Sequence, residues 1–247
     1  MTALILALVA GAVVGLALGG LGGGGGVLAV PALIYLLDFT PAEATTASLV
    51  IVTLTSVTAL TGHARDGNVA WRTGLLFAAA GIAPAMIAGA AAGHLPPWLL
   101  TVAFALVAAP AALRMLRPAR GETPGPVRPG KACAAGAGLG TVTGFLGVGG
   151  GFLAVPALVG MVSLPMRRAV GTSLLVITVN SLAALTARAG TGMHLDWAVL
   201  APFTAAAILG AWDGKRLSKR IKGPALQRLF ASVLLAVAAL MLVGVLA

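Results

Sequence analysis

Charged residues are scarce in this chain of 247 residues, and acidic ones are the scarcest. Only 9% of the residues are charged, 59% are hydrophobic, and the mean hydropathy is +1.04. This composition excludes an ordinary soluble domain and indicates a polytopic membrane protein. The formal net charge is +10. We interpret it as loop charge on the cytoplasmic face, because no basic run interleaved with aromatic residues points to nucleic acid.

Cysteine is nearly absent, and several catalytic motifs are missing altogether. The single residue, Cys133, excludes an intrachain disulfide and gives no support for a thiolate metal cluster. The sequence has no His-Glu-x-x-His, and no Lys-Ser or Lys-Thr pair follows either glycine run, which argues against a metalloprotease and a nucleotide-binding loop. His63, His94 and His194 all fall in predicted loops at span ends, which disfavours a membrane serine protease. We therefore expect no enzymatic activity, no cofactor and no metal.

Glycine, by contrast, is abundant, and it marks an internal repeat. The stretch from Gly22 to Leu33 returns as Gly147 to Leu158, at an offset of 125 residues. From Gly24 to Ala64, 18 of 41 positions are identical to their partners. The chain is therefore two copies of one unit. We predict a first transmembrane repeat at 1–117, a cytoplasmic linker at 118–131 and a second repeat at 132–247.

Each unit is expected to hold one short apolar segment and four longer ones. The short segments, 27–37 and 152–162, cannot span a hydrocarbon core of about 30 Å as helices. The longer apolar segments are expected at 3–18, 43–62, 71–93, 98–116, 132–146, 169–187, 197–212 and from 224 onward.

The glycine runs should break a helix at the same place in each unit. Three glycines in each run are candidate substrate ligands: Gly24, Gly25 and Gly26 in the first, and Gly149, Gly150 and Gly151 in the second. A helix that restarts after a break exposes unpaired N–H groups and a positive dipole end, which suit an anion. Paired breaks in two halves are typical of a transporter's substrate site. Close helix packing through small residues is the alternative, and it stays open.

The basic residues predict the orientation. With the linker inside, every Lys and Arg except Arg188 falls inside, whereas Asp38, Glu43 and Asp196 fall outside. This assignment makes each glycine-broken segment a hairpin that enters and leaves on the same side. It also gives equivalent loops opposite sidedness, so the repeats should be inverted, with both termini outside.

Hydroxyl-bearing side chains crowd the span after each hairpin. The candidate substrate-binding residues among them and their neighbours are Thr46, Ser48, Thr53, Thr172, Ser173 and Asn180. Neutral donors suit an anion that must leave again, although helix–helix hydrogen bonding explains such residues equally well. His63 and Arg65 are candidates for gating or coupling, against the alternatives of a solvated interface residue and a positive-inside anchor.

The doubled Gly-Gly-Gly-x-x-x-x-Pro-x-Leu motif, followed by 44–49 (Ala-Thr-Thr-Ala-Ser-Leu) or 169–174 (Ala-Val-Gly-Thr-Ser-Leu), resembles the sulfite exporter TauE/SafE family of bacterial membrane proteins. The resemblance covers nearly the whole chain. It implies secondary transport, usually outward, of sulfite or of small organosulfonates such as sulfoacetate. The first copy departs from the Gly-Thr-Ser pattern of the second, so the halves can contribute unequally.

The sequence thus predicts an all-α polytopic membrane protein with two inverted-topology repeats, each a glycine-broken helical hairpin plus three transmembrane helices. We expect a secondary transporter of a small anion that works by alternating access in the bacterial inner membrane. An anion channel of similar build is the alternative. The partners are the anionic substrate and the lipid bilayer, without nucleic acid, and a homo-oligomer stays open.

Overall fold

The computed structural model describes residues 2–92, 97–116, 129–146, 151–188 and 196–246, and every regular element in them is a helix. This confirms the all-α fold. The helices are α1 (Thr2–Leu21), α2 (Gly24–Leu37), α3 (Pro41–Arg65), α4 (Trp71–Ala92), α5 (Pro97–Leu116), α6 (Pro129–Leu146), α7 (Gly151–Gly160), α8 (Met166–Arg188), α9 (Trp197–Arg220) and α10 (Gly223–Leu246). Five of them, α1, α3, α4, α8 and α10, are long and apolar enough to cross a membrane.

Two helices continue beyond their predicted ends. The prediction that His63 lies in a loop is wrong, because α3 runs on to Arg65 and includes it in the last turn. The predicted loop from Lys215 is also wrong, since α9 continues to Arg220. Lysine and arginine are good helix formers and are favoured near a helix C-terminus, where they face the negative end of the dipole. His94 and His194 lie outside the described residues.

The repeat is visible in local geometry. The turns that follow the short helices α2 and α7 pass through equivalent residues, Asp38 and Ser163, which both have left-handed backbones with φ of 54° and 57°. The next N–H in each half reaches back to an equivalent carbonyl: Phe39 to Leu33 at 3.1 Å, and Leu164 to Leu158 at 3.0 Å. The same sequence pattern therefore folds into the same helix-ending turn twice.

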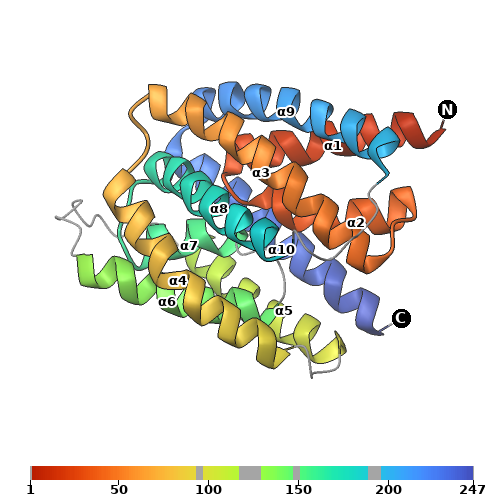
Figure 1. Ribbon diagram of the computed structural model, residues 1–247. Coiled ribbons are helices and arrows are strands. Elements are labelled where there is room, and N and C mark those ends of the chain that lie inside the picture. The colour runs from red at the N-terminus through yellow and green to blue at the C-terminus, as the bar shows by residue number, and fades with distance from the viewer. Residues whose placement is uncertain (1, 93–96, 117–128, 147–150, 189–195, 247) are drawn as a thin grey trace.

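The helices form two bundles, and each bundle takes its fourth helix from the other half (Figure 1). The first bundle holds α1, α2, α3 and α9, whereas the second holds α6, α7, α8 and α4. The two most extensive interfaces are α1 with α9 and α4 with α6, which are equivalent under the repeat. The bundles meet where α3 crosses α8, and α5 pairs with α10 beside them.

Small residues allow the exchanged helices to approach closely. A Cβ atom added at Gly11 or Gly15 of α1 would fall on the backbone of α9, at Phe203 and Ala207. The equivalent glycines of α6, Gly136 and Gly140, lie in the same way against Phe77 and Gly81 of α4. Small residues at a helix interface permit backbone contact in membranes. For these four glycines, close packing is therefore the role that the structure supports.

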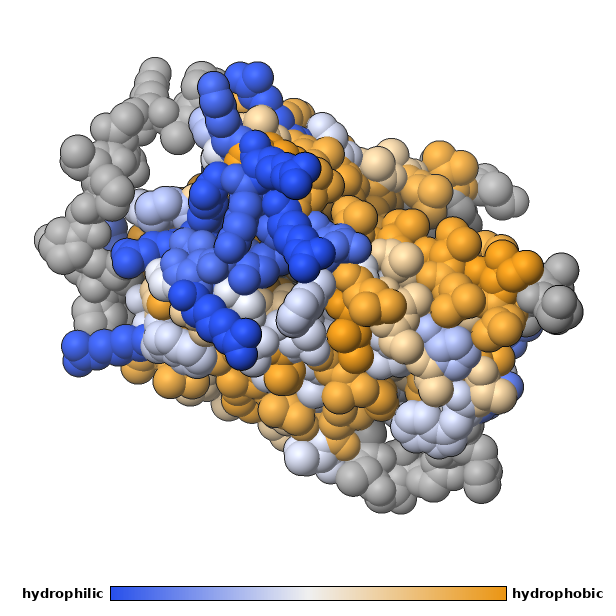
Figure 2. All heavy atoms as spheres, turned by 90° about the horizontal axis from the view of Figure 1, so that it is seen from above, coloured by the Kyte–Doolittle hydropathy of each residue, from blue (hydrophilic) through white to orange (hydrophobic). Residues whose placement is uncertain are grey.

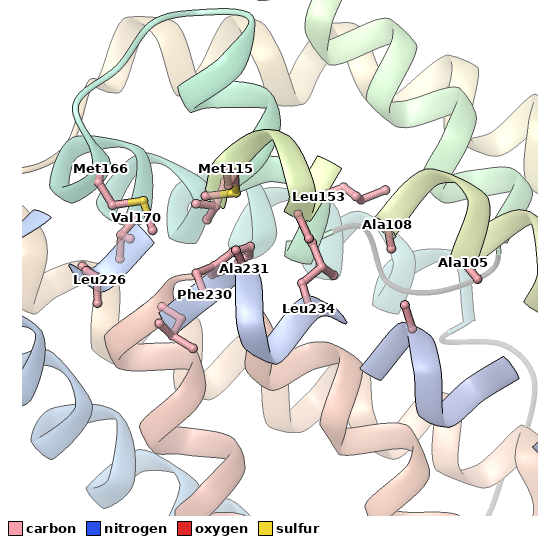
Figure 3. Packing of buried hydrophobic residues seen from close by; sticks show 14 residues of the cluster. Ala105, Ala108, Met115, Leu153, Met166, Val170, Leu226, Phe230, Ala231 and Leu234 are labelled. Atoms are coloured by element: carbon pink, nitrogen blue, oxygen red, sulfur yellow. The ribbon is translucent and has the colours of Figure 1, made fainter. Parts of the chain in front are cut away.

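The α5–α10 pair has the largest apolar cluster (Figure 3). Phe230 and Leu234 of α10 pack there with Ala108 of α5 and Leu153 of α7. The cluster reaches Val170 on α8, so it touches the second bundle as well. Burial of this kind fixes the position of α5 and α10 against the two bundles.

The sequence-equivalent helices α3 and α8 run antiparallel. Asn68 and Ala70, which follow α3, lie against Gly171 and Thr172 near the start of α8. This is the arrangement that an inverted repeat would produce. Both chain ends lie at the end of the molecule opposite to these residues (Figure 1).

Candidate functional site

The first glycine break lies between α1 and α2. Gly22 has a positive φ of 77°, which only glycine adopts readily, and it turns the chain out of α1. Gly24, Gly25 and Gly26 then form the first turn of α2, whose N-cap residue Gly23 makes no side-chain capping bond. The backbone N–H groups of a first helical turn have no acceptor within the helix. Gly149 and Gly150 lie outside the described residues, and Gly151 begins α7.

The side chain of Ser173 forms a hydrogen bond with the backbone at the first glycine break and does not face an open cavity. Its side chain is fully buried, and its Oγ lies 2.7 Å from the carbonyl oxygens of Gly22 and Val170. A hydroxyl has a single proton to donate, so these two acceptors share it. The bond to Gly22 joins α8, in the second bundle, to the break in the first. Ser173 thus fixes the break, and it would have to release a carbonyl to donate to a substrate.

The predicted serine pair does not converge on one point. Ser48 donates to the Thr45 carbonyl at 2.8 Å, within its own helix. Each serine lies seven residues, or about 10 Å, from the start of its helix. Because α3 and α8 are antiparallel, Ser48 and Ser173 lie near opposite ends of the molecule. In this conformation they do not share a ligand.

Hydroxyls do converge where α3 crosses α8, at mid-depth in the molecule. The Oγ1 of Thr178 lies 3.0 Å from the Oγ of Ser56 and 2.8 Å from the carbonyl oxygen of Leu174, and these two acceptors share its single proton. Thr178 and Ser56 each lie about 14–18 Å from the basic end of their helices. Thr53 and Ser181, the repeat equivalents of Thr178 and Ser56, are buried on the same two helices at 6% exposure each. We call these four residues the crossing cluster. They are the polar core of the bundle interface.

Asn180, a predicted ligand, lies beside this cluster in sequence. Its Oδ1 atom is buried and has no hydrogen-bond partner among the described residues. A buried carbonyl oxygen without a partner is costly, so it favours a donor supplied by a ligand or water.

The remaining predicted ligands have other surroundings. Thr172 is fully buried and accepts a hydrogen bond from the backbone N–H of Ala70 at 3.0 Å, which fixes the turn before α4. Thr46 is buried on α3, two residues from Ser48. Neither residue belongs to the crossing cluster.

A second polar region lies at the end where α3 and α9 finish and α8 begins. A small cavity there, with a volume of about 10 Å³, is lined by polar side chains together with Val170 and Leu226. Its polar members, which define what we call the basic-end cavity, are His63, Asp66, Asn68, Arg167, Ser218 and Lys219. Arg65, which precedes Asp66, is exposed and is not part of the lining.

Ion pairs hold this end of the first bundle together. Asp66 lies 3.0 Å from the Nζ of Lys215 and 2.9 Å from that of Lys219, both on α9. The hydrogen bond from Lys219 holds the pKa of the Asp66 carboxyl below its ordinary value, and Lys215 acts in the same direction. Lys215 also donates to the carbonyl of Gly62 at 2.6 Å. The carboxylate thus ties the end of α3 to the exchanged helix.

Sequence reasoning did not select Ser56, Thr178, Arg167 or Lys219 as site residues. The repeat offset could have found the first two, since it pairs Ser56 with Ser181 and Thr53 with Thr178. Arg167 and Lys219 look like ordinary positive-inside residues in sequence, and only the helix exchange brings them together. No three His, Cys, Asp or Glu side chains gather as a metal site would require in the part of the chain that the structure describes.

Comparison with known proteins gives a family match over most of the chain. The family model described as sulfite exporter TauE/SafE matches residues 7–241. A probable membrane transporter protein of Xylella fastidiosa (strain 9a5c) is 34% identical over 245 residues, which cover 95% of this chain and 93% of that protein. The probable membrane transporter protein YunE of Bacillus subtilis (strain 168) is 27% identical, with coverage of 88% and 86%. These names describe membrane transporters and not enzymes.

Proposed function

Because this chain belongs to the sulfite exporter TauE/SafE family and is a membrane transporter, we propose that it moves a small anion by alternating access. The substrate is sulfite or an organosulfonate such as sulfoacetate, and the direction is outward. The two repeats have inverted topology, both termini lie outside, and the end that carries Asp66 and Lys219 faces the cytoplasm of a bacterial cell.

The observation that carries the proposal is the crossing cluster between the two bundles. The hydroxyls of Thr53, Ser56, Thr178 and Ser181 lie at mid-depth, where a ligand can be reached from either side in turn. In this conformation three of them donate to carbonyls of their own helices, and they would have to turn to the anion. Among the described residues, one hydrogen bond, between Thr178 and Ser56, joins the cluster across the two helices. A rocking motion of one bundle against the other exchanges this bond for bonds to the anion.

The free N–H groups at the start of α2 add a second attraction for an anion. Gly24, Gly25 and Gly26 present them without a capping side chain. Ser173 holds the preceding residue, Gly22, and so couples the break to the opposite bundle. We propose that release of this bond accompanies the change of access.

Counterflow in proteoliposomes tests the proposal. Vesicles preloaded with unlabelled sulfite or sulfoacetate should accumulate the labelled anion, and uptake should saturate. Thr178→Val and Ser181→Ala should lose most of this exchange, whereas Thr61→Val and Thr186→Val should keep it. The two control threonines lie on the same helices, are exposed, and donate only within their own helix.

Each alternative gives its own result. Saturable exchange that is equally strong in all four variants would remove the crossing cluster from the site. Anion flux without counterflow would identify a channel. If the wild-type chain moves no small anion at all, the anion-transport proposal fails.

A further inference from the structure

His63 lines the basic-end cavity, and one of its two ring nitrogens has a hydrogen-bond partner while the other has none among the described residues. The side chain is 4% exposed, and its Nε2 lies 3.2 Å from the carbonyl oxygen of Gly19 on α1. A carbonyl oxygen can only accept, so Nε2 carries the hydrogen, and in the neutral imidazole Nδ1 is left as a lone-pair acceptor. Nδ1 is buried and has no hydrogen-bond partner among the residues that the structure describes. The atom that complements it must be a donor.

The same cavity carries excess positive charge. The charged groups that face His63 are Asp66 beyond the end of its own helix, Lys215 and Lys219 on α9, and Arg167 on α8. Asp66 is the sole carboxylate among the described lining residues, and it already binds both lysines. Arg167 instead donates to the backbone carbonyls of Lys219 and Ile221, at 3.0 and 3.3 Å. Its charge therefore has no carboxylate partner in the described part of the chain.

These two features together specify a ligand. The excess positive charge favours an anion, the lone pair of Nδ1 favours a hydrogen-bond donor, and an anion that carries an O–H group would supply both. Figure 2 shows that hydrophilic side chains gather at one end of the molecule, while the rest of this face is largely apolar.

Resting on the proposed transport function, we propose that the basic-end cavity is the cytoplasmic entry site and takes a small oxyanion that keeps one acidic hydrogen. The O–H group of the ligand donates to Nδ1 of His63, and its anionic oxygens bind Arg167 and Lys219. No covalent bond or proton changes hands at the site. An anion that enters in this form carries its proton with it, so transport moves one proton equivalent together with each anion.

The cavity has room for about one water in the conformation seen here. The ligand therefore enters as the guanidinium of Arg167 leaves the carbonyls of Lys219 and Ile221 for the anion. These bonds join α8 to the end of α9, which belong to different bundles. Binding at the entry site would thus loosen the contact that closes this end.

Equilibrium binding to the purified full-length chain tests the inference, with labelled sulfite and labelled methanesulfonate as probes. Methanesulfonate is a similar monoanion that has no acidic hydrogen. At pH 6, Arg167→Gln and Lys219→Gln should each raise the dissociation constant for sulfite about tenfold. This is the change expected when one hydrogen bond to a charged group is lost. Their neighbours serve as matched controls: Arg168→Gln and Arg220→Gln remove the same charge from exposed positions that do not line the cavity, and should change binding less than about twofold.

His63→Gln distinguishes recognition from packing. Glutamine can still donate to the Gly19 carbonyl, but it lacks an acceptor at the position of Nδ1. We expect it to weaken sulfite binding about tenfold at pH 6 and to leave methanesulfonate binding unchanged. Equal losses for both anions, or no loss for either, would overturn the assignment. So would equal effects of Arg167→Gln and Arg168→Gln. If the wild-type chain still shows counterflow in any of these cases, the transport proposal survives and only the entry site is refuted.

Discussion

Gly15 of α1 offers a direct test of the helix exchange. An added methyl group at this position would fall on the backbone of Ala207 in α9, so Gly15→Ala must push the two helices apart. Overpacking of a well-packed contact costs about 1–3 kcal/mol. Alanine is also a better helix former than glycine by about 1 kcal/mol, and that gain must be separated from the packing cost.

Gly138→Ala is the matched control for this separation. Gly138 is also helical, on α6, but it is exposed and a methyl group there meets nothing within 4 Å. Both variants gain the same helix propensity, so the difference between them isolates the packing cost. Gly140→Ala should behave like Gly15→Ala, because Gly140 lies against Gly81 in the equivalent interface.

Thermal unfolding in detergent, followed by tryptophan fluorescence, measures the difference. A cost of about 1–3 kcal/mol should lower the midpoint of Gly15→Ala and Gly140→Ala by roughly 2–12 °C relative to Gly138→Ala. Midpoints that agree for all three variants would refute the close approach of these helices. A loss in Gly15→Ala alone would show that the two interfaces are not equivalent.

Three further outcomes follow from contacts described above. Asp66→Asn should lower the unfolding midpoint at pH 7 by roughly 2–4 °C, because the ion pairs of Asp66 with Lys215 and Lys219 contribute about 1 kcal/mol to the free energy of unfolding. Because the folded pKa of Asp66 lies below its unfolded value of about 3.9, this stabilisation is present above pH 3.9. The gap between variant and wild type should therefore close as the pH falls through the folded pKa, and a constant gap would contradict the ion pair. Gly22→Ala should be more destabilising than Gly67→Ala, since both glycines have positive φ but only at Gly22 would a methyl group meet Ser173; equal midpoints would argue against that contact. A double-mutant cycle of Ser56→Ala and Thr178→Val should give a coupling of about 0.6–1.7 kcal/mol, and additive effects would mean that their hydrogen bond contributes nothing.

The sequence predicts helices well here because hydropathy and the repeat act locally. All ten predicted segments are helices, and the matching turns at Asp38 and Ser163 follow from the same local pattern used twice. The ends of α3 and α9 are less predictable. Their last turns consist largely of polar and charged residues, and such residues at the end of an apolar segment predict a loop as readily as a helix. His63 was misplaced for this reason: burial against α1, which the sequence does not show, makes the extra turn favourable.

The site was harder to predict than the fold, because it depends on which helices meet. Equivalent positions such as Ser48 and Ser173 lie side by side in an alignment, yet antiparallel helices place them at opposite ends. Thr178 and Ser56 occupy non-equivalent positions and nevertheless meet at the crossing. Charge patterns predict the sidedness of Arg167 and Lys219, but their proximity follows from the transfer of α9 to the first bundle.

The exchange of α4 and α9 also sets the order in which the protein can be assembled during synthesis. The first bundle cannot close until α9, the last helix but one, has left the ribosome. Until then Gly11 and Gly15 of α1 lack the helix against which they pack in the folded protein. The first bundle is therefore incomplete in the bilayer while the second half is being made. A chain cut between the repeats would therefore yield two fragments that each need a helix of the other to complete a bundle.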